Sequence, residues 1–229
     1  MPRTEQEYRA ARETYAELGI DTDQAIETLA SIPLSIHCWQ GDDVIGFDGA
    51  TSLSGGILST GSYPGRARNA EELRSDAVFA FSLIPGKKRF NLHAMYAETG
   101  GAKVDRCDLE PRYYEGWIEW AKQQHIGLDF NPTFFSHPLA ESGWTLAHPD
   151  NDIRDFWIRH GKASRRIAQS IADTLKDHVV NNLWVPDGYK DMPADRLGPR
   201  LRLKESLDAI YSEKLPNDRV LDSVESKLF

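Results

Sequence analysis

Two charged side chains near the end of the chain, Glu225 and Lys227, carry the clearest chemical signal in the sequence. They stand two positions apart in an apolar segment with the pattern of a β-strand, so both point to the same side of that strand. Burying either charge alone is costly, whereas pairing the charges or binding a cation at the carboxylate relieves that cost. The spacing therefore favours a metal ligand at Glu225 beside the Lys227 ammonium group. The alternative is an ordinary ion pair on an exposed edge strand.

Polar or aromatic side chains also mark the ends of earlier predicted strands. His93 lies in the run Asn-Leu-His-Ala-Met-Tyr, where alternation places it on one face with Asn91 and Met95. It is a candidate functional histidine, and a hydrogen-bonded core histidine is the alternative. Trp39 either lines a site or packs in the core. Trp184 offers a flat ring that suits the C–H side of a sugar, with core packing as its alternative.

A second polar group follows the third predicted strand. Asp129 and Asn131, followed by Phe134 and Phe135, are expected to form a polar rim beside an aromatic wall, and the alternative for Asp129 is a loop cap. The histidines of this region lack the spacing of a zinc site. No Gly-x-Ser-x-Gly elbow and no cysteine with a defined partner indicates nucleophilic catalysis.

Alternating helices and strands must position these side chains. Helices are expected at 5–18, 24–32, 69–84, after Asp108, at 153–171 and at about 203–211. Asn69 with Glu72 fits a capping box, residues 150–152 are expected to cap the apolar stripe of 153–171, and Gly198-Pro199 is expected to interrupt the approach to the last helix. Strands are expected at 34–39, 89–96, 126–130, 179–185 and 220–229. Repeated β–α units predict a parallel sheet, because parallel neighbours need a crossover that a helix usually supplies. Residues 1–33 are predicted as a helical extension and residues 34–229 as the first five β/α units of a truncated TIM barrel.

An open doubly wound sheet is the rival to a barrel. No Gly-x-Gly-x-x-Gly or P-loop turn follows any predicted strand, which disfavours nucleotide-binding open sheets. Polar groups near the carboxyl ends of many strands favour a barrel. A buried last strand at 220–229 would leave hydrogen-bonding groups without partners. We therefore expect the chain to be the first part of a longer α/β protein, here an incomplete barrel of about five strands.

The composition excludes several classes of protein. The 229 residues are 40% hydrophobic with a formal net charge of −8, which argues against binding a nucleic-acid backbone. No apolar run reaches the length of a membrane span, and the first residues lack the apolar core of a signal peptide. The two cysteines suit a reducing cytoplasm. A cytoplasmic globular protein without nucleic-acid or membrane partners is expected.

Several long strings occur in collinear order across the chain. They are Ser35-Ile-His-Cys-Trp-Gln-Gly-Asp-Asp-Val, Gly61-Ser-Tyr-Pro-Gly-Arg-Ala-Arg-Asn, Asn91-Leu-His-Ala-Met-Tyr, Gly127-Leu-Asp-Phe-Asn-Pro, Phe156-Trp-Ile-Arg-His-Gly-Lys-Ala-Ser-Arg-Arg, Trp184-Val-Pro-Asp-Gly and Val224-Glu-Ser-Lys-Leu-Phe. Together they resemble the L-rhamnose isomerase family over essentially the whole sequence. The resemblance implies a (β/α)8 barrel, a homotetramer and the interconversion of L-rhamnose and L-rhamnulose with divalent cations, typically Mn²⁺.

The resemblance also assigns roles to residues. Glu225 looks like the first ligand of the metal that holds the substrate, and Lys227 looks like the polar catalytic partner near the reacting carbons. The residues that match the sugar pocket are Trp39, His93 and Trp184, and those that match the apolar pocket for the methyl end of a 6-deoxy sugar are Val44, Leu53, Met95 and Tyr96. A hydroxyl forced into that apolar pocket would lose hydrogen bonds at a cost of roughly 1–3 kcal/mol.

One departure from the family bears on activity. Family members continue past Phe229, and their remaining metal ligands come from later strands, so this chain alone is expected to be inactive. The alternatives are a non-catalytic truncated remnant and another metal-dependent barrel such as a sugar epimerase. The sequence is compatible with hydrogen transfer between C1 and C2 either as a hydride or through an enediol.

Overall fold

The structure is a computed structural model, and it describes residues 3–37, 46–47, 67–187 and 194–226. The helices are α1 (Arg3–Glu17), α2 (Thr22–Ser31), α3 (Ala70–Leu83), α4 (Glu115–Gln124), α5 (Asn151–Leu175) and α6 (Gly198–Ile210). The strands are β1 (Leu34–His37), β2 (Lys88–His93), β3 (Gly127–Asn131), β4 (Val179–Val185) and β5 (Val220–Ser226). Short 3-10 turns are η1 (Ala94–Tyr96), η2 (Arg106–Asp108), η3 (Pro111–Tyr114) and η4 (Pro138–Ala140). None of the described helices is long and apolar enough to cross a membrane.

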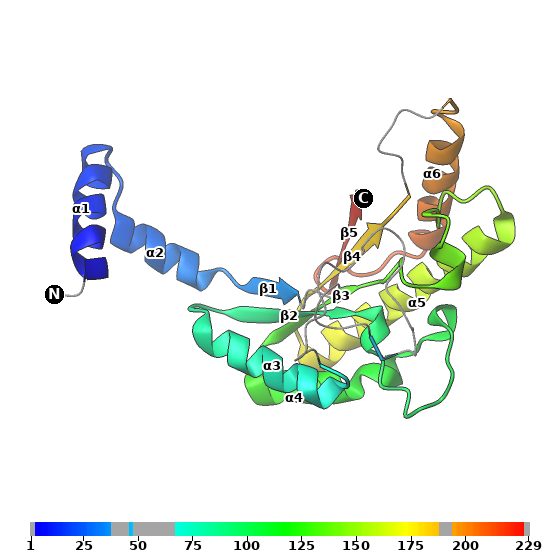
Figure 1. Ribbon diagram of the computed structural model, residues 1–229, viewed down its shortest axis with the longest axis horizontal. Helices are drawn as coiled ribbons and strands as arrows, with labels where there is room; N and C mark the ends of the chain where they lie inside the picture. The colour runs from blue at the N-terminus through cyan, green and yellow to red at the C-terminus, as the bar shows by residue number, and fades with distance from the viewer. Residues whose placement is uncertain (1–2, 38–45, 48–66, 188–193, 227–229) are drawn as a thin grey trace.

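The described strands form one parallel sheet in the order β1-β2-β3-β4-β5 (Figure 1). Each strand pairs with the next along the chain, and β4 and β5 stay in register from Val179–Val220 to Val185–Ser226. A doubly wound sheet would reverse its strand order at a switch point. This sheet instead advances in one direction with a helix after each of its first four strands. It is consistent with the predicted incomplete barrel.

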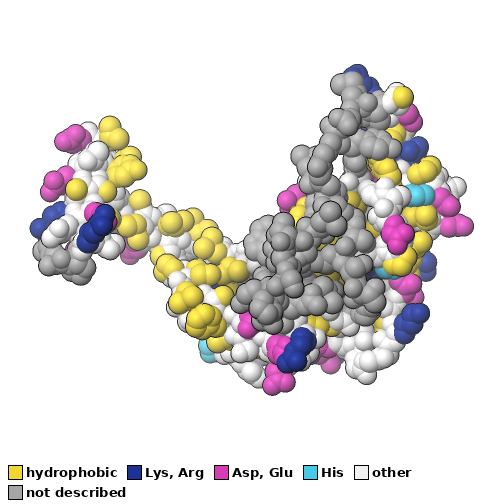
Figure 2. Space-filling view, viewed as in Figure 1, with side chains coloured by type: hydrophobic (Ala, Val, Ile, Leu, Met, Phe, Trp, Pro, Cys, Tyr) yellow, Lys and Arg dark blue, Asp and Glu magenta, His cyan; other side chains and the backbone are white. Residues whose placement is uncertain are grey.

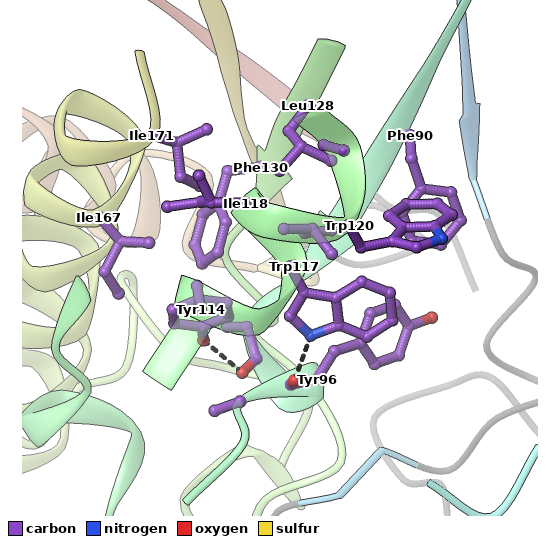
Figure 3. Close-up of a cluster of buried hydrophobic side chains, with 14 of the residues drawn as sticks. Phe90, Tyr96, Tyr114, Trp117, Ile118, Trp120, Leu128, Phe130, Ile167 and Ile171 are labelled. Carbon is purple, nitrogen blue, oxygen red and sulfur yellow. Dashed lines mark hydrogen bonds between the residues drawn. The ribbon is translucent and has the colours of Figure 1, made fainter. Parts of the chain in front are cut away.

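One face of the sheet packs against α3, α4 and α5 through a large apolar core (Figures 1 and 3). The ring of Phe90 on β2 stacks on Trp117 of α4 with ring centroids 5.7 Å apart. Tyr114 packs edge-on against Phe130 of β3 at 5.2 Å. Aromatic pairs in these geometries add to the free energy gained by burying their surface. The core therefore fixes which face of β2 and β3 is apolar.

Helix α5 shows how the sequence sets a local element. Its N-cap is Asp150, whose side chain accepts a hydrogen bond from the Asp152 N–H, and it ends at Lys176 in the left-handed conformation. Both ends follow common capping rules. The buried side chains lie on the predicted stripe and include Phe156, Trp157, Ile167 and Ile171. The prediction of this helix is confirmed.

The predicted second strand is too long. It was expected to run to Tyr96, but β2 ends at His93 and the next three residues form the turn η1. Side chains of the following elements donate hydrogen bonds to the carbonyl groups of this turn. Tyr114 Oη donates to Ala94 O (2.6 Å), and Trp117 Nε1 donates to Tyr96 O (2.9 Å). These bonds replace the strand ladder. The alternation of side chains between two faces therefore ends at His93, and it does not determine the face on which Met95 lies.

The predictions for the last two elements also need correction. Gly198-Pro199 was expected to interrupt the approach to the last helix, but α6 begins there, because a proline in the first turn has no N–H to lose and Asp195 Oδ1 accepts from Gly198 N at 2.8 Å. The last strand was expected to be buried. Only Val220 is buried among the described residues of β5, while Leu221 and Val224 are 43% and 47% exposed. Within the described chain β5 is an edge strand that pairs with β4 alone.

Helices α1 and α2 extend away from the sheet and join it through β1 (Figure 1). They pack against each other through Tyr8 Oη, which donates to Asp23 Oδ1 at 2.5 Å, and Asp21 caps α2. Neither helix has a buried residue. Apolar side chains are visible along this arm in Figure 2. The division at residue 33 stays a prediction.

Candidate functional site

The sheet has a second face, opposite the core, which carries polar side chains. Strand residues alternate between faces, and the core holds Phe90, Leu92, Leu128 and Phe130 on the helix side. The intervening positions form what we call the polar face. Its members are Ser35 and His37 of β1, Arg89, Asn91 and His93 of β2, Asp129 and Asn131 of β3, Asn182 and Trp184 of β4, and Ser223 and Glu225 of β5.

The hydrogen-bond partners of side chains on β4 and β5 show the same division into a helix side and a polar face. On the helix side, Arg165 of α5 donates to Asp222 (2.9 Å), which also accepts from Asn181 Nδ2 (2.9 Å). On the polar face, Asn182 Nδ2 donates to Glu225 Oε2 (2.8 Å). The Glu225 carboxylate therefore lies on the polar face, although it is exposed there.

Ion pairs and hydrogen bonds link the side chains at the amino-terminal end of the polar face, which we call its base. Arg89 is 6% exposed and donates two hydrogen bonds to Asp129, of 2.9 and 3.0 Å. Asp129 Oδ1 also accepts from Val180 N at 2.8 Å, and Arg89 pairs with Asp177. Burial alone would raise the pKa of Asp177, but the hydrogen bond and charge of Arg89 outweigh it and hold that pKa below its usual value. Asp129 thus joins strands internally and does not form the predicted rim.

His93 sits near the carboxyl-terminal end of the polar face. It is 0% exposed, its ring meets His37 edge-on with centroids 5.9 Å apart, and the Tyr96 ring is 5.2 Å away. Burial lowers the pKa of His37, against the carboxylates of Glu225 and Asp129, which favour its protonated form. Carboxylates on β3 and β5 therefore both act on the pKa of His37, which lies on β1.

The turn η1 brings the predicted apolar residues Met95 and Tyr96 directly after His93. Both are fully buried. Phe47 N donates to Met95 O at 2.7 Å, and its ring lies 5.8 Å from that of Tyr96. Gly46 has a φ of 82°, and a Cβ there would lie 2.8 Å from Met95 Cβ. The close approach therefore requires glycine at this position.

Trp184 lies near the end of β4 and is half-buried, with its ring edge-on to Phe135 at 5.6 Å. A bridge between Thr133 and Trp184 continues the pairing of β3 and β4 past Asn131. Trp184 is in turn the register partner of Glu225. The structure therefore brings three predicted site residues, His93, Trp184 and Glu225, to the carboxyl ends of their strands on one face.

Whether Glu225 could bind a metal depends on the chemistry of its carboxylate oxygens. A carboxylate oxygen suits a hard divalent cation such as Mn²⁺. The described residues contain no group of three or more His, Cys, Asp or Glu side chains placed to hold an ion. A specific divalent site needs several ligands, so Glu225 could supply one of them and the described residues do not complete the set. Four predicted site residues, Trp39, Val44, Leu53 and Lys227, lie outside the described residues.

Two positioning residues were missed by sequence reasoning. Arg106 is 2% exposed and donates to the carbonyls of Thr133 (2.9 Å) and Ser136 (3.0 Å), in the loop after β3. The Asp187 carboxylate, just after β4, accepts from the N–H groups of Thr145 (2.6 Å) and Ala147 (2.7 Å) in the same loop. Burial raises the pKa of Asp187, against these hydrogen bonds. Only the Pro-Asp-Gly turn around Asp187 offered a sequence signal.

His160 shows which histidine belongs to the core. It is fully buried, its Nδ1 lies 2.9 Å from Arg106 O, and the Phe134 ring is 5.1 Å away. Burial lowers its pKa from 6.5 to about 3, against that hydrogen bond. The Nδ1–H therefore donates to the carbonyl and the ring stays neutral.

The fold and the polar face together define a class of protein. They are those of an α/β protein whose five described parallel strands are consistent with an incomplete barrel. In barrels of this kind, ligand sites form at the carboxyl ends of the strands.

Comparison with known proteins places the chain within that class. The family model described as L-rhamnose isomerase (RhaA) matches residues 3–229. The L-rhamnose isomerase of Listeria monocytogenes serotype 4a (strain HCC23) is 52% identical over 225 residues, which cover 97% of this chain and 53% of that protein. Those of Rhodopirellula baltica and Mannheimia succiniciproducens are 51% and 52% identical, covering 98% and 100% of this chain and 53% and 55% of theirs. The chain belongs to the L-rhamnose isomerase family and spans about half the length of the curated relatives it matches.

Proposed function

We propose that this chain is the N-terminal half of an enzyme that interconverts L-rhamnose and L-rhamnulose. The observation that carries the proposal is the family match over residues 3–229, on a sheet that gathers His93, Trp184 and Glu225 at one edge. The proposal includes a complete (β/α)8 barrel and a homotetramer, as the resemblance implies, and a cytoplasmic location, which the two cysteines suit.

The described residues supply the sugar-binding part of this function. His93 is buried beside His37 and can hydrogen-bond a sugar hydroxyl once the substrate excludes water. Trp184 presents an indole ring that can cover the C–H side of the sugar. Met95 and Tyr96 lie together in η1, where they can receive the methyl end. We assign Trp39, Val44 and Leu53 to the same pocket.

The proposed cofactor is a divalent cation, Mn²⁺, with Glu225 as one ligand. When bound, such an ion polarises the substrate oxygens as a Lewis acid, which is worth several kcal/mol as negative charge develops. Asn182 holds one oxygen of Glu225 and so fixes the direction of the carboxylate. Lys227 is proposed as the catalytic ammonium group near the reacting carbons, because its sequence spacing from Glu225 is that of two residues on one face of a strand.

The test starts from the natural protein, meaning the complete product of the reading frame that contains this sequence. We expect it to form L-rhamnulose from L-rhamnose in the presence of Mn²⁺, and a Glu225→Ala variant to lose that activity. We expect the 229-residue chain alone to be inactive, because the described residues do not complete a metal site. A natural protein that leaves L-rhamnose unchanged but turns over phosphorylated ketoses would favour the epimerase. A stop codon directly after Phe229 with no turnover would favour a non-catalytic remnant.

A further inference from the structure

One buried side-chain amide on the polar face has no hydrogen-bonding partner among the described residues. Asn131, the last residue of β3, is 0% exposed, and neither its Oδ1 nor its Nδ2 makes a hydrogen bond within the described chain. Buried side-chain amides are nearly always hydrogen-bonded, because leaving both ends unpaired loses the hydration of the group without compensation. An exception at the edge of a candidate site calls for a ligand.

Register fixes where this amide lies. Asn131 is the Cα partner of His93 on β2, and both residues end their strands. Two residues farther along, Thr133 pairs with Trp184, and the buried Thr133 hydroxyl also makes no hydrogen bond to the part of the chain that the structure describes. Asn131 therefore stands beside His93 and two positions before Thr133, whose partner on β4 is Trp184. His93 and Trp184 are the two side chains that we propose to contact the sugar.

We propose that Asn131 is a sugar-binding and specificity-determining residue, whose amide hydrogen-bonds hydroxyl groups of the substrate. A side-chain amide offers one acceptor and two donor hydrogens, so it can accept from one hydroxyl and donate to its neighbour. Vicinal hydroxyls of a sugar present that pair of groups. The inference rests on the proposed function for the identity of the sugar, and on the burial and register of Asn131 for the site.

A matched residue on the opposite face provides the control. Asn181 of β4 is also 0% exposed and is the Cα partner of Phe130, the neighbour of Asn131. It lies on the helix side and its Nδ2 donates to Asp222 Oδ1 at 2.9 Å. Replacing Asn181 by leucine removes a bond that the protein itself makes, whereas replacing Asn131 removes none that the described chain makes.

The experiment measures sugar binding and thermal unfolding of the natural protein and of its Asn131→Leu and Asn181→Leu variants. The probe is L-rhamnitol, the reduced sugar that cannot isomerise, together with analogues that each lack one of its hydroxyls. We expect Asn131→Leu to weaken L-rhamnitol binding about tenfold, the usual effect of one lost hydrogen bond. The analogue lacking the bound hydroxyl should bind wild type about tenfold more weakly and bind the variant no worse than L-rhamnitol does.

Stability separates a binding role from a structural one. Because the Asn131 amide makes no hydrogen bond to the described residues, replacing it by a leucine of similar size should leave the melting temperature unchanged or raise it. Asn181→Leu should lower the melting temperature and preserve the discrimination between L-rhamnitol and its analogues. A lower melting temperature for Asn131→Leu with equal losses for every analogue, or unchanged sugar binding, would overturn the inference. Absence of isomerase turnover in wild type would count against the proposed function alone, because binding and melting are measured without turnover.

Discussion

The two ends of the sheet's polar face differ in how far the protein satisfies its own polar groups. At the base, Arg89 and Asp129 pair with each other, and both have further bonds to Asp177 or to backbone groups. At the carboxyl-terminal end, Asn131 and Thr133 are equally buried, yet their side-chain polar atoms make no hydrogen bond in the described chain. Polar residues at the base therefore hold strands together, whereas Asn131 and Thr133 have no such role in the described chain and are the groups that we propose for ligand binding.

Breaking the base should give the largest effect on stability. Arg89→Met leaves the buried carboxylate of Asp129 without its positively charged partner, which should cost about 3–5 kcal/mol in the free energy of unfolding. Urea denaturation of the natural protein measures this loss. The double variant with Asp129→Leu should regain part of it, because no unpaired charge remains. A loss below about 1 kcal/mol in the single variant would remove the contrast between the two ends.

The buried His160, on the helix side of the sheet, should make the free energy of unfolding depend on pH. Its pKa is 6.5 when exposed and about 3 in the fold, so the unfolded chain binds a proton that the folded chain does not. The contribution of the neutral His160 ring to the free energy of unfolding is fully present above about pH 6.5. It is lost as the pH falls toward 3, at about 1.4 kcal/mol per pH unit. Between pH 7 and 5, wild type should lose about 2 kcal/mol more than His160→Gln in urea unfolding. Parallel pH profiles for the two proteins would contradict this.

The turn that ends β2 should respond to loss of a single hydrogen bond. Tyr114→Phe removes the donor to Ala94 O, at 2.6 Å, while the ring stays in the core. We expect the free energy of unfolding to fall by about 1 kcal/mol. Amide hydrogen exchange at Met95 and Tyr96 should become faster in the variant. Unchanged exchange there would show that Trp117 alone holds the turn.

The smallest change in stability is expected at the carboxyl-terminal end. Asn182→Ala removes a donor to the exposed Glu225 carboxylate, so unfolding should change by less than about 1 kcal/mol. If Glu225 binds the metal, losing the partner that orients it should weaken Mn²⁺ binding about 10- to 100-fold. Calorimetric titration of the natural protein with Mn²⁺ measures this. A large loss of stability with unchanged Mn²⁺ affinity would show that Asn182 has a structural role, like Arg89 and Asp129 at the amino-terminal end of the face.

The pattern of apolar residues was enough to predict the elements that pack by their own periodicity. The stripe of α5 and its Asp150 cap, and the Asn69 cap of α3, appear in the structure as predicted. The capping box at α3 is altered, because the Glu72 carboxylate accepts from Arg68 N, at 2.8 Å. Strand ends were less predictable. The end of β2 depends on Tyr114 and Trp117, which come more than fifteen residues later in the chain.

The site shows the same division between local and long-range information. The residue types and the resemblance pointed to His93, Trp184 and Glu225, since a polar or aromatic residue after an apolar run is visible in the sequence. The same type of signal misassigned Asp129 to the rim, because its partner Arg89 is separated from it by 40 positions. Arg106 had no local signal, since its partners are carbonyls of a distant loop.

The order of residues along the chain was sufficient to establish the β/α alternation, the helix caps and the family, because each of these depends on spacing within a short segment. Only the folded structure decided which polar groups are satisfied. Asp129 and Asn131 are two residues apart on one strand and one face, yet the first has an arginine partner and the second has no hydrogen-bonding partner in the described chain. That difference arises from which neighbouring strand residues face each of them, which depends on the register of the assembled sheet.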